Sequence, residues 1–218
     1  MKSLKTIFNK KYFWNVLGIA FFSRLLLAIA MSLMPFYAKY VLGAEGFYAG
    51  LLIGVTMGAG LISLPLWKRL TDKNGTRKTL FYSGFLSIAA SALLLGDYSI
   101  PYVYIVFAIF GFFSIGTQVV PIVIAAELAD IDYRETKLKR EGLIYGLMGS
   151  AVRFPPALAG LVLGEILVMA GYNANLPVDM NPSQVGEYIQ LFFFLGSLVS
   201  LLLIMLFNYM HKEELVYD

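Results

Sequence analysis

The sequence predicts an all-α membrane protein of six transmembrane helices. Of its 218 residues, 59% are hydrophobic and only 14% are charged, against roughly 25% charged residues in an ordinary soluble domain. The mean hydropathy is +0.73, and six long apolar runs cover most of the chain. These values exclude a soluble globular protein and a disordered one. The runs are too long for the strands of a membrane β-barrel and do not alternate, which argues against that fold.

Each run is long enough to cross a membrane, because about 20 apolar residues in a helix span a hydrocarbon core about 30 Å thick. The six runs occupy residues 12–38, 47–67, 79–96, 100–126, 143–170 and 188–210. Charged residues occur only in the first run, which contains Arg24, and in the fifth, which contains Arg153 and Glu165. We therefore expect residues 1–218 to form one six-helix domain in a lipid bilayer. The first run is too long for a signal peptide, so we expect it to remain as a helix.

The basic residues predict how these helices are oriented. Fourteen of the 17 lysines and arginines lie before the first run, between the second and third, between the fourth and fifth, or after the sixth. The other side of the membrane receives only Lys39. Because basic residues concentrate in cytoplasmic loops, we expect both termini in the cytoplasm and the protein in a prokaryotic plasma membrane.

Several functional classes are excluded by what the sequence lacks. It contains no cysteine, and its one histidine, His211, follows the last run. Thiolate metal sites and cysteine nucleophiles are therefore impossible. The apolar runs contain no paired carboxylates and no serine–base arrangement, and the chain has no nucleotide-binding motif. We expect neither an enzyme nor a protein that binds a metal, a cofactor or nucleic acid.

The connection between the second and third runs reads D-K-x-G-x-R-K over residues 72–78. So short a connection needs a tight turn, and Gly75 permits one because glycine tolerates positive φ. Asp72 can accept hydrogen bonds from the start of the next helix or from Arg77. Such a contact can hold two helices together in one state and release them in another. A solvated basic loop with no such role is the alternative.

The connection between the fourth and fifth runs, residues 127–142, carries many charges of both signs. Glu127 and Asp130 are three residues apart, so they share one face of a helix where the fourth run leaves the membrane. Further charges follow at Asp132, Arg140 and Glu141. This pattern suggests a charge-paired latch on the cytoplasmic side, with a plain solvated loop as the alternative.

Two arginines lie deep in predicted membrane helices. Arg24 and Arg153 are each about 15 Å from a membrane surface at 1.5 Å per residue, where a charge costs at least about 2.5–3.5 kcal/mol. No Asp or Glu lies at matching depth in any run. Their partners must be the backbone carbonyls of a broken helix, an anionic or sugar substrate, or the carboxylates of another chain.

Proline predicts a broken helix beside Arg153. Pro155 and Pro156 remove two backbone donors and disfavour helix in the preceding residue. Transporters build many substrate and ion sites from broken helices near the middle of the membrane. A structural kink beside a water-solvated arginine is the alternative. In the fourth run, Gln118 can hydrogen-bond either a polyol or a neighbouring helix.

Glycines recur every four residues in two of the runs. The second run contains one such series and the fifth contains two, at Gly50, Gly54 and Gly58, at Gly142 and Gly146, and at Gly160 and Gly164. Small-residue faces let helices pack closely, and they also suit helices that slide against each other. We expect them to serve close packing.

The motif at residues 72–78 resembles the loop between the second and third helices of each six-helix half in the major facilitator superfamily. The segment from residue 130 to residue 172 is similar to the glycoside–pentoside–hexuronide:cation symporters, the family that contains melibiose permease. Its matching positions are Asp130, Asp132, Tyr133, Thr136, Lys139, Arg140, Glu141, Gly142, Tyr145, Gly146, Gly149, Arg153, Ala157, Leu158, Gly171 and Tyr172. The chain departs from the family where Lys137 replaces a glycine, Lys139 an arginine and Arg153 the usual lysine.

This resemblance implies that the chain corresponds to the C-terminal six-helix half of a twelve-helix transporter. Such a protein moves a small polar solute, such as a sugar or glycoside, by alternating access in symport with H⁺ or Na⁺. By this resemblance and the patterns above, the cavity residues are Arg153, Arg24, Gln118, Pro155 and Pro156. The cytoplasmic gate residues are Asp72, Gly75, Arg77, Asp130, Asp132, Arg140 and Glu141.

The resemblance also implies that the chain does not transport alone. In the resembled family the main cation-site carboxylates belong to the N-terminal half. We therefore expect a second six-helix chain, or a second copy of this one, as partner. The alternative function is a non-transporting membrane subunit, or an orphaned transporter half with a role in assembly.

Overall fold

The computed structural model describes residues 7–8, 11–44, 46–96 and 99–210. Within these ranges the chain is helical and has no strand, so the predicted all-α fold is confirmed. The elements are α2 (Lys11–Tyr40), α3 (Phe47–Asn74), α4 (Thr76–Ala92), α5 (Ile100–Thr136), α6 (Glu141–Ala151), α7 (Phe154–Met169), the short 3₁₀ helix η1 (Val178–Met180) and α8 (Gln184–Met210). His211 and several of the basic residues used above lie outside the described residues, namely Lys2, Lys5, Lys10 and Lys212.

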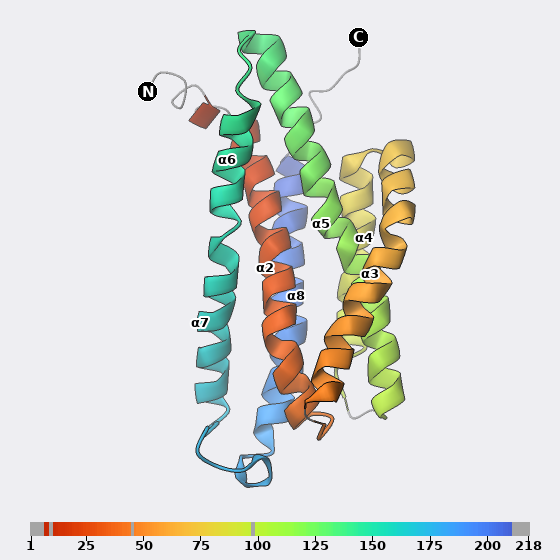
Figure 1. Cartoon of the computed structure of the whole chain (residues 1–218), viewed down its shortest axis with the longest axis vertical. Coiled ribbons are helices and arrows are strands. Elements are labelled where there is room, and N and C mark those ends of the chain that lie inside the picture. Colours follow the sequence, from red (N-terminus) through yellow and green to blue (C-terminus); the bar gives the residue numbers. More distant parts are fainter. Residues whose placement is uncertain (1–6, 9–10, 45, 97–98, 211–218) are drawn as a thin grey trace.

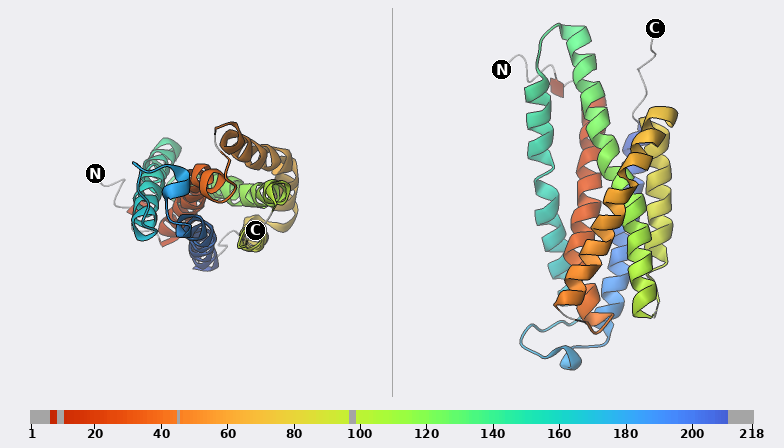
Figure 2. Two further views of the ribbon diagram at one scale, coloured as in Figure 1. Left: turned by 90° about the horizontal axis from the view of Figure 1, so that it is seen from below. Right: turned by 45° about the vertical axis from the view of Figure 1, so that its right-hand side comes forward.

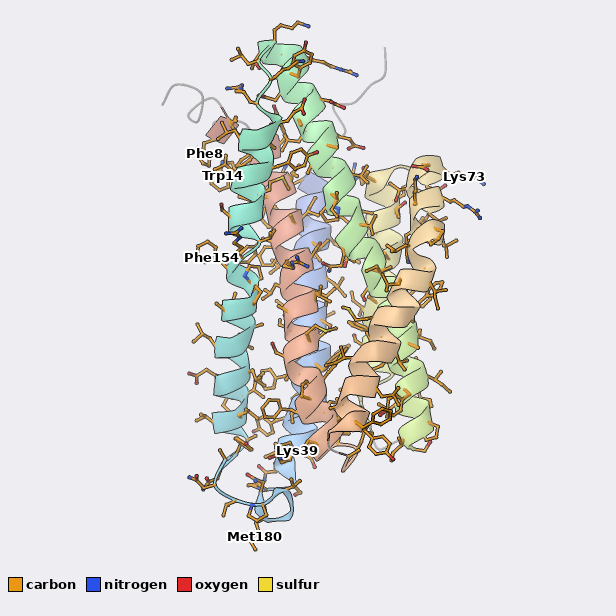
Figure 3. The ribbon with its side chains drawn as sticks, viewed as in Figure 1. Phe8, Trp14, Lys39, Lys73, Phe154 and Met180 are labelled. Atoms are coloured by element: carbon orange, nitrogen blue, oxygen red, sulfur yellow. The ribbon has the colours of Figure 1, made fainter. Side chains whose placement is uncertain are left out.

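The helices run up and down in one elongated bundle (Figure 1). The start of α2, the α3–α4 turn, the α5–α6 connection and the end of α8 lie at one end, which we call the basic end. The connections after α2, α4 and α7 lie at the opposite end. Lys73 marks the basic end and Lys39 the opposite end (Figure 3). The basic connections therefore share one side of the bundle, as the charge pattern predicts.

Among the described residues, five segments are long and apolar enough to cross a membrane: α2, α3, α5, the α6–α7 pair and α8. The sixth helix, α4, has 17 residues, which gives a length of about 26 Å. It is shorter than the hydrocarbon core of a typical bilayer, about 30 Å. The predicted third run, residues 79–96, extends past this helix because Leu93, Leu94 and Leu95 are apolar but lie in a turn.

The core is built around α2, which contacts α3, α5, α7 and α8. The ring of Tyr37 meets the ring of Phe107 edge to face at 5.1 Å. Phe193 packs against both Phe107 and Phe110, with ring centroids 5.1 and 5.3 Å apart. These rings are fully or almost fully buried and join α2, α5 and α8. Seen along the bundle (Figure 2), α3 lies on one side of α2 and α5, and α4 and α8 lie on the opposite side. The α6–α7 pair lies at the end of the bundle next to α2.

Glycine lets α3 and α5 cross in close contact. A Cβ atom on Gly111 would overlap the carbonyl of Thr56, and one on Gly60 would lie 3.2 Å from the carbonyl oxygen of Gly111. Above the crossing, Ser63 Oγ and Trp67 Nε1 both donate to the carbonyl of Phe112, at 2.9 and 2.8 Å. Close backbone approach and these two hydrogen bonds fix the angle between the two helices.

Two predicted connections are much shorter than expected. The α3–α4 connection is Gly75 alone, with φ 80°, which confirms the predicted glycine turn. In the expected connection over residues 127–142, α5 continues to Thr136 and only residues 137–140 are non-helical. Hydropathy identifies only the apolar part of a helix. The charge-rich residues 127–136 that follow the apolar run are also helical, in water. With 37 residues, α5 is about 55 Å long and extends beyond a bilayer.

The predicted break in the fifth run is confirmed. α6 ends at Ala151, residues 152–153 form a turn, and α7 begins at Phe154. Pro155 and Pro156 lie in the first turn of α7, where their missing N–H groups leave no helical hydrogen bond unmade within α7. The two prolines therefore begin a new helix instead of bending an existing one.

The crossing of α3 and α5 yields a stability prediction. We expect Gly111→Leu to lower the free energy of unfolding by about 2–3 kcal/mol, because the new side chain cannot fit against the Thr56 carbonyl. Gly54→Leu is the matched control, because no described atom lies within 4 Å of a Cβ on Gly54. The melting temperatures of both variants in detergent would be compared with the wild type. Equal losses would contradict the close contact.

Candidate functional site

A pocket of about 320 Å³ opens between α2, α5 and α6. This volume is at the lower end of the range of small-molecule sites, about 300–1,000 Å³. Its polar lining residues are Ser23, Arg24, Gln118 and Tyr145; its other lining residues are Ala20, Pro121, Ile122, Ala125, Met148, Gly149 and Val152. Arg24 and Gln118, which the sequence predicts for one cavity, are thus brought together. We call this the Arg24 pocket.

Gln118 links α5 to α2 within this pocket. Its Nε2 donates to the carbonyl oxygen of Ser23 at 2.6 Å and to Thr117 Oγ1 at 3.3 Å. Its Oε1 has no hydrogen bond from any described residue. The side chain therefore does bond a neighbouring helix, one of the two predicted alternatives, and still offers an acceptor to a polar ligand.

The side-chain hydroxyl of Ser23, a residue that lines the pocket, has no hydrogen-bond partner among the described residues. Ser23 is 98% buried. A buried hydroxyl without a partner is unfavourable by about 1–3 kcal/mol. With the guanidinium of Arg24 and the Oε1 of Gln118, it gives the pocket both donors and an acceptor, which suits hydroxyl groups or an anionic oxygen.

Arg24 lies on α2 and lines the pocket, whereas Arg153 lies in the turn between α6 and α7. Arg24 is exposed and makes no ion pair with a described residue. Arg153 is exposed at the turn between α6 and α7, next to Val152, which lines the pocket. Arg153 follows this lining residue directly, but neither it nor Pro155 nor Pro156 lines the pocket, so the structure does not bring these three predicted cavity residues into it.

A second, smaller pocket of about 90 Å³ shares Gln118 as a wall residue and lies between α2, α3 and α5. A third, of about 490 Å³, lies between α3 and α5 at the basic end, where Lys68, Thr71 and Asp72 contribute its polar atoms. All three pockets are therefore lined only by the helices α2, α3, α5 and α6 and the residue after α6. The helices α4 and α8 contribute to none of them.

The latch predicted at the basic end forms between Arg140 and Asp132. Arg140 donates from Nε and Nη2 to the two carboxylate oxygens of Asp132, at 3.1 and 2.9 Å. Both side chains are nearly buried, 9% and 3% exposed. Asp130, another predicted gate residue, is exposed two residues away, on another side of α5, and makes no ion pair with a described residue. Glu141 is exposed at the start of α6.

The predicted contact between Asp72 and Arg77 is not made. Arg77 instead reaches α8, where Nη2 lies 3.4 Å from the carbonyl oxygen of Tyr209 and the guanidinium lies 5.7 Å from the Tyr209 ring. Asn208 Nδ2 donates to the carbonyl of Arg77 at 3.0 Å. Asp72 is exposed and has no hydrogen bond in the part of the chain that the structure describes. These contacts join the α3–α4 turn to α8.

The glycine series do not pack against helices of this chain. A Cβ atom placed on any of them would meet no described atom within 4 Å, which applies to Gly50, Gly54, Gly58, Gly142, Gly146, Gly160 and Gly164. They lie on α3, α6 and α7, the spans that are least buried in the bundle. The expectation that they serve close packing is thus not met within the described chain. We call these residues the glycine face.

Two residues that line the pocket, Ser23 and Tyr145, were not predicted as cavity residues from the sequence. Ser23 resembled any packing serine of an apolar helix, and only its place beside Arg24 marked it. Tyr145 appeared only as a position matched to a family. The choice of Asp132 over Asp130 also needed the structure, because both carboxylates precede Arg140 at similar spacing.

Comparison with known proteins identifies the family. A family model described as MFS/sugar transport protein matches residues 1–212. An uncharacterized symporter of Synechocystis sp. is 24% identical over 216 residues, which cover 91% of this chain and 39% of the relative. A glucuronide carrier protein homolog of Escherichia coli is 29% identical over 145 residues, 64% of this chain and 31% of the relative. No solved structure matches.

The chain spans less than two fifths of the length of these curated relatives. The family match covers almost all of it, and it agrees with a helical bundle whose spans are long and apolar enough for a membrane. This integral membrane chain belongs to the MFS/sugar transport protein family, a family of transporters.

Proposed function

We propose that this chain is one six-helix half of a secondary transporter that moves a sugar or glycoside by symport with H⁺ or Na⁺. The observation that carries the proposal is the Arg24 pocket, which lies beside a broken helix in a chain of a transporter family. Transporter sites commonly combine these features. This pocket, which includes Val152 next to Arg153, would bind the solute.

A second six-helix unit would complete this site. Arg24 on α2 and Arg153 in the α6–α7 turn are both exposed, and each charge would cost at least about 2.5–3.5 kcal/mol if it faced lipid. The glycine face on α3, α6 and α7 makes no close contact with any described residue, as expected if helices of another unit pack there. The greater length of the curated relatives supports this arrangement. The partner would be a second chain or a second copy.

The solute would be held by hydrogen bonds from several helices. Arg24 and the hydroxyl of Ser23 would donate to it, and Gln118 Oε1 would accept. One curated relative is named for glucuronide transport, and a glucuronide has both hydroxyls and a carboxylate that a guanidinium can bind. A neutral glycoside would use the hydroxyl contacts alone.

Alternating access would require the two ends of the bundle to open in turn. The turn between α6 and α7 is a natural hinge, because no helical hydrogen bonds connect the two helices through the prolines. The Arg140–Asp132 pair would keep α6 attached to α5 at the basic end. By the positive-inside rule, that end would face the cytoplasm.

Uptake by vesicles tests the proposal. Vesicles would contain the chain together with any protein that purifies with it, and a panel of labelled glucuronide, glycoside and pentoside would be supplied with and without H⁺ or Na⁺ gradients. We expect gradient-driven uptake of at least one compound. Uptake no greater than in protein-free vesicles, for every compound and gradient, would favour a non-transporting subunit.

We expect Arg153→Ala to reduce this uptake by about tenfold or more, because one charged contact contributes about 1.5–3 kcal/mol. Arg153→Lys should retain part of the activity, since it keeps the charge. Arg134→Ala is the matched control, because Arg134 is exposed in the last turn of α5, beyond the membrane. The amount of each variant inserted in membranes would be measured in parallel. Full uptake by Arg153→Ala would contradict the assignment.

The pair of Arg140 and Asp132 should hold the α5–α6 connection in place. We expect Asp132→Ala to destabilise that connection by about 3 kcal/mol, because it leaves a nearly buried guanidinium without its partner. Hydrogen exchange of the amides of residues 137–141 should become faster. Asp130→Ala, two residues away and exposed, should leave exchange unchanged. Equal acceleration in both variants would show that the pair does not fix the connection.

A further inference from the structure

The α3–α4 turn carries basic side chains that no described carboxylate neutralises. Lys73 is exposed at the end of α3 and Lys78 is exposed in the first turn of α4. The side chain of Lys73 points away from the bundle (Figure 3). Asp72 makes no ion pair with any of them. The turn is therefore a cationic surface at the basic end of the molecule.

Arg77 is held in position on this surface by α8. Its guanidinium lies over the Tyr209 ring at 5.7 Å, and its backbone carbonyl accepts a hydrogen bond from Asn208 Nδ2. A guanidinium that lies over an aromatic ring still has N–H groups that can bind an oxyanion. Arg77 is thus a positioned donor on the same turn as the exposed Lys73 and Lys78.

An exposed aromatic surface follows along α4. Phe81, Tyr82 and Phe85 are 50%, 50% and 59% exposed, and the Phe81 and Phe85 rings are nearly parallel at 6.5 Å. Arg77, Phe81 and Phe85 are four residues apart and so share one helix face. This face lies on α4, whereas the residues of the glycine face lie on α3, α6 and α7.

The length of α4 indicates where this cationic surface would lie in a bilayer. At about 26 Å, α4 is shorter than a hydrocarbon core of about 30 Å. A short helix draws its flanking basic residues toward the membrane interface. In a bilayer, Arg77 and Lys78, in the first turn of α4, would then lie level with the lipid phosphates.

We propose that the α3–α4 turn binds an anionic phospholipid of the surrounding bilayer. Arg77, Lys73 and Lys78 would hold the headgroup phosphate, which suits guanidinium and ammonium donors. An acyl chain would lie along Phe81 and Phe85. Charge complementarity and the apolar face directly below the basic residues select a lipid over a soluble anion. The proposal does not rest on transport.

Lipid binding to the full chain in detergent tests this proposal by native mass spectrometry, with phosphatidylglycerol and phosphatidylcholine as probes. We expect the wild type to bind phosphatidylglycerol more tightly. Lys73→Gln/Lys78→Gln should weaken that binding by about tenfold, because each basic residue near an anionic lipid adds a several-fold gain in affinity. This variant keeps the contact between Arg77 and Tyr209, so loss of α4–α8 packing cannot explain the result.

Two further variants keep the test decisive. Lys137→Gln/Lys139→Gln removes the same charge from the α5–α6 connection, beyond the membrane, and should change affinity by less than about twofold. Phe81→Ala/Phe85→Ala should weaken lipid binding without changing the charge. Equal binding of the two lipids by the wild type, or equal losses in the two lysine variants, would overturn the proposal. A mass spectrum that shows a bound protein and no bound lipid would also overturn the proposal.

Discussion

A bilayer interior cannot solvate a charge, and this constraint determines which side of the bundle can face lipid. Arg24 lies in α2 and Arg153 in the turn between α6 and α7, and neither forms an ion pair with the described residues. Each would cost at least about 2.5–3.5 kcal/mol if it faced lipid. The side of the bundle formed by α2, α5 and the broken α6–α7 helix must therefore meet water, a solute or another protein. The pockets lie among these helices and α3.

The glycines fall into two groups that serve different contacts. Gly60 and Gly111 allow α3 and α5 to cross, and Gly116 lies against Ser83 and Trp67. The glycine face has no described neighbours, although its four-residue spacing is equally regular. Close packing inside the chain and a surface without described contacts thus use one residue type, and spacing alone does not separate them.

Most of the fold follows from the sequence, because hydropathy and helix length are local properties. The six runs, the Gly75 turn and the break before Pro155 were all predictable. The extension of α5 to Thr136 was not, since hydropathy ends where the charged residues begin. The pairing of Arg140 with Asp132 was also beyond the sequence, because it depends on how α5 is rotated relative to α6. The pocket residue Ser23 carried no signal of its own.

The mass of the complex in its own membranes tests most directly whether this chain is half of a larger transporter. The tagged chain would be purified from the membranes of its host in mild detergent and weighed intact. We expect a stoichiometric complex with a second six-helix chain or a second copy, and we expect Gly54→Trp to dissociate it without lowering the melting temperature of the chain. A lone chain of 24.2 kDa in wild-type preparations would contradict the half-transporter assignment.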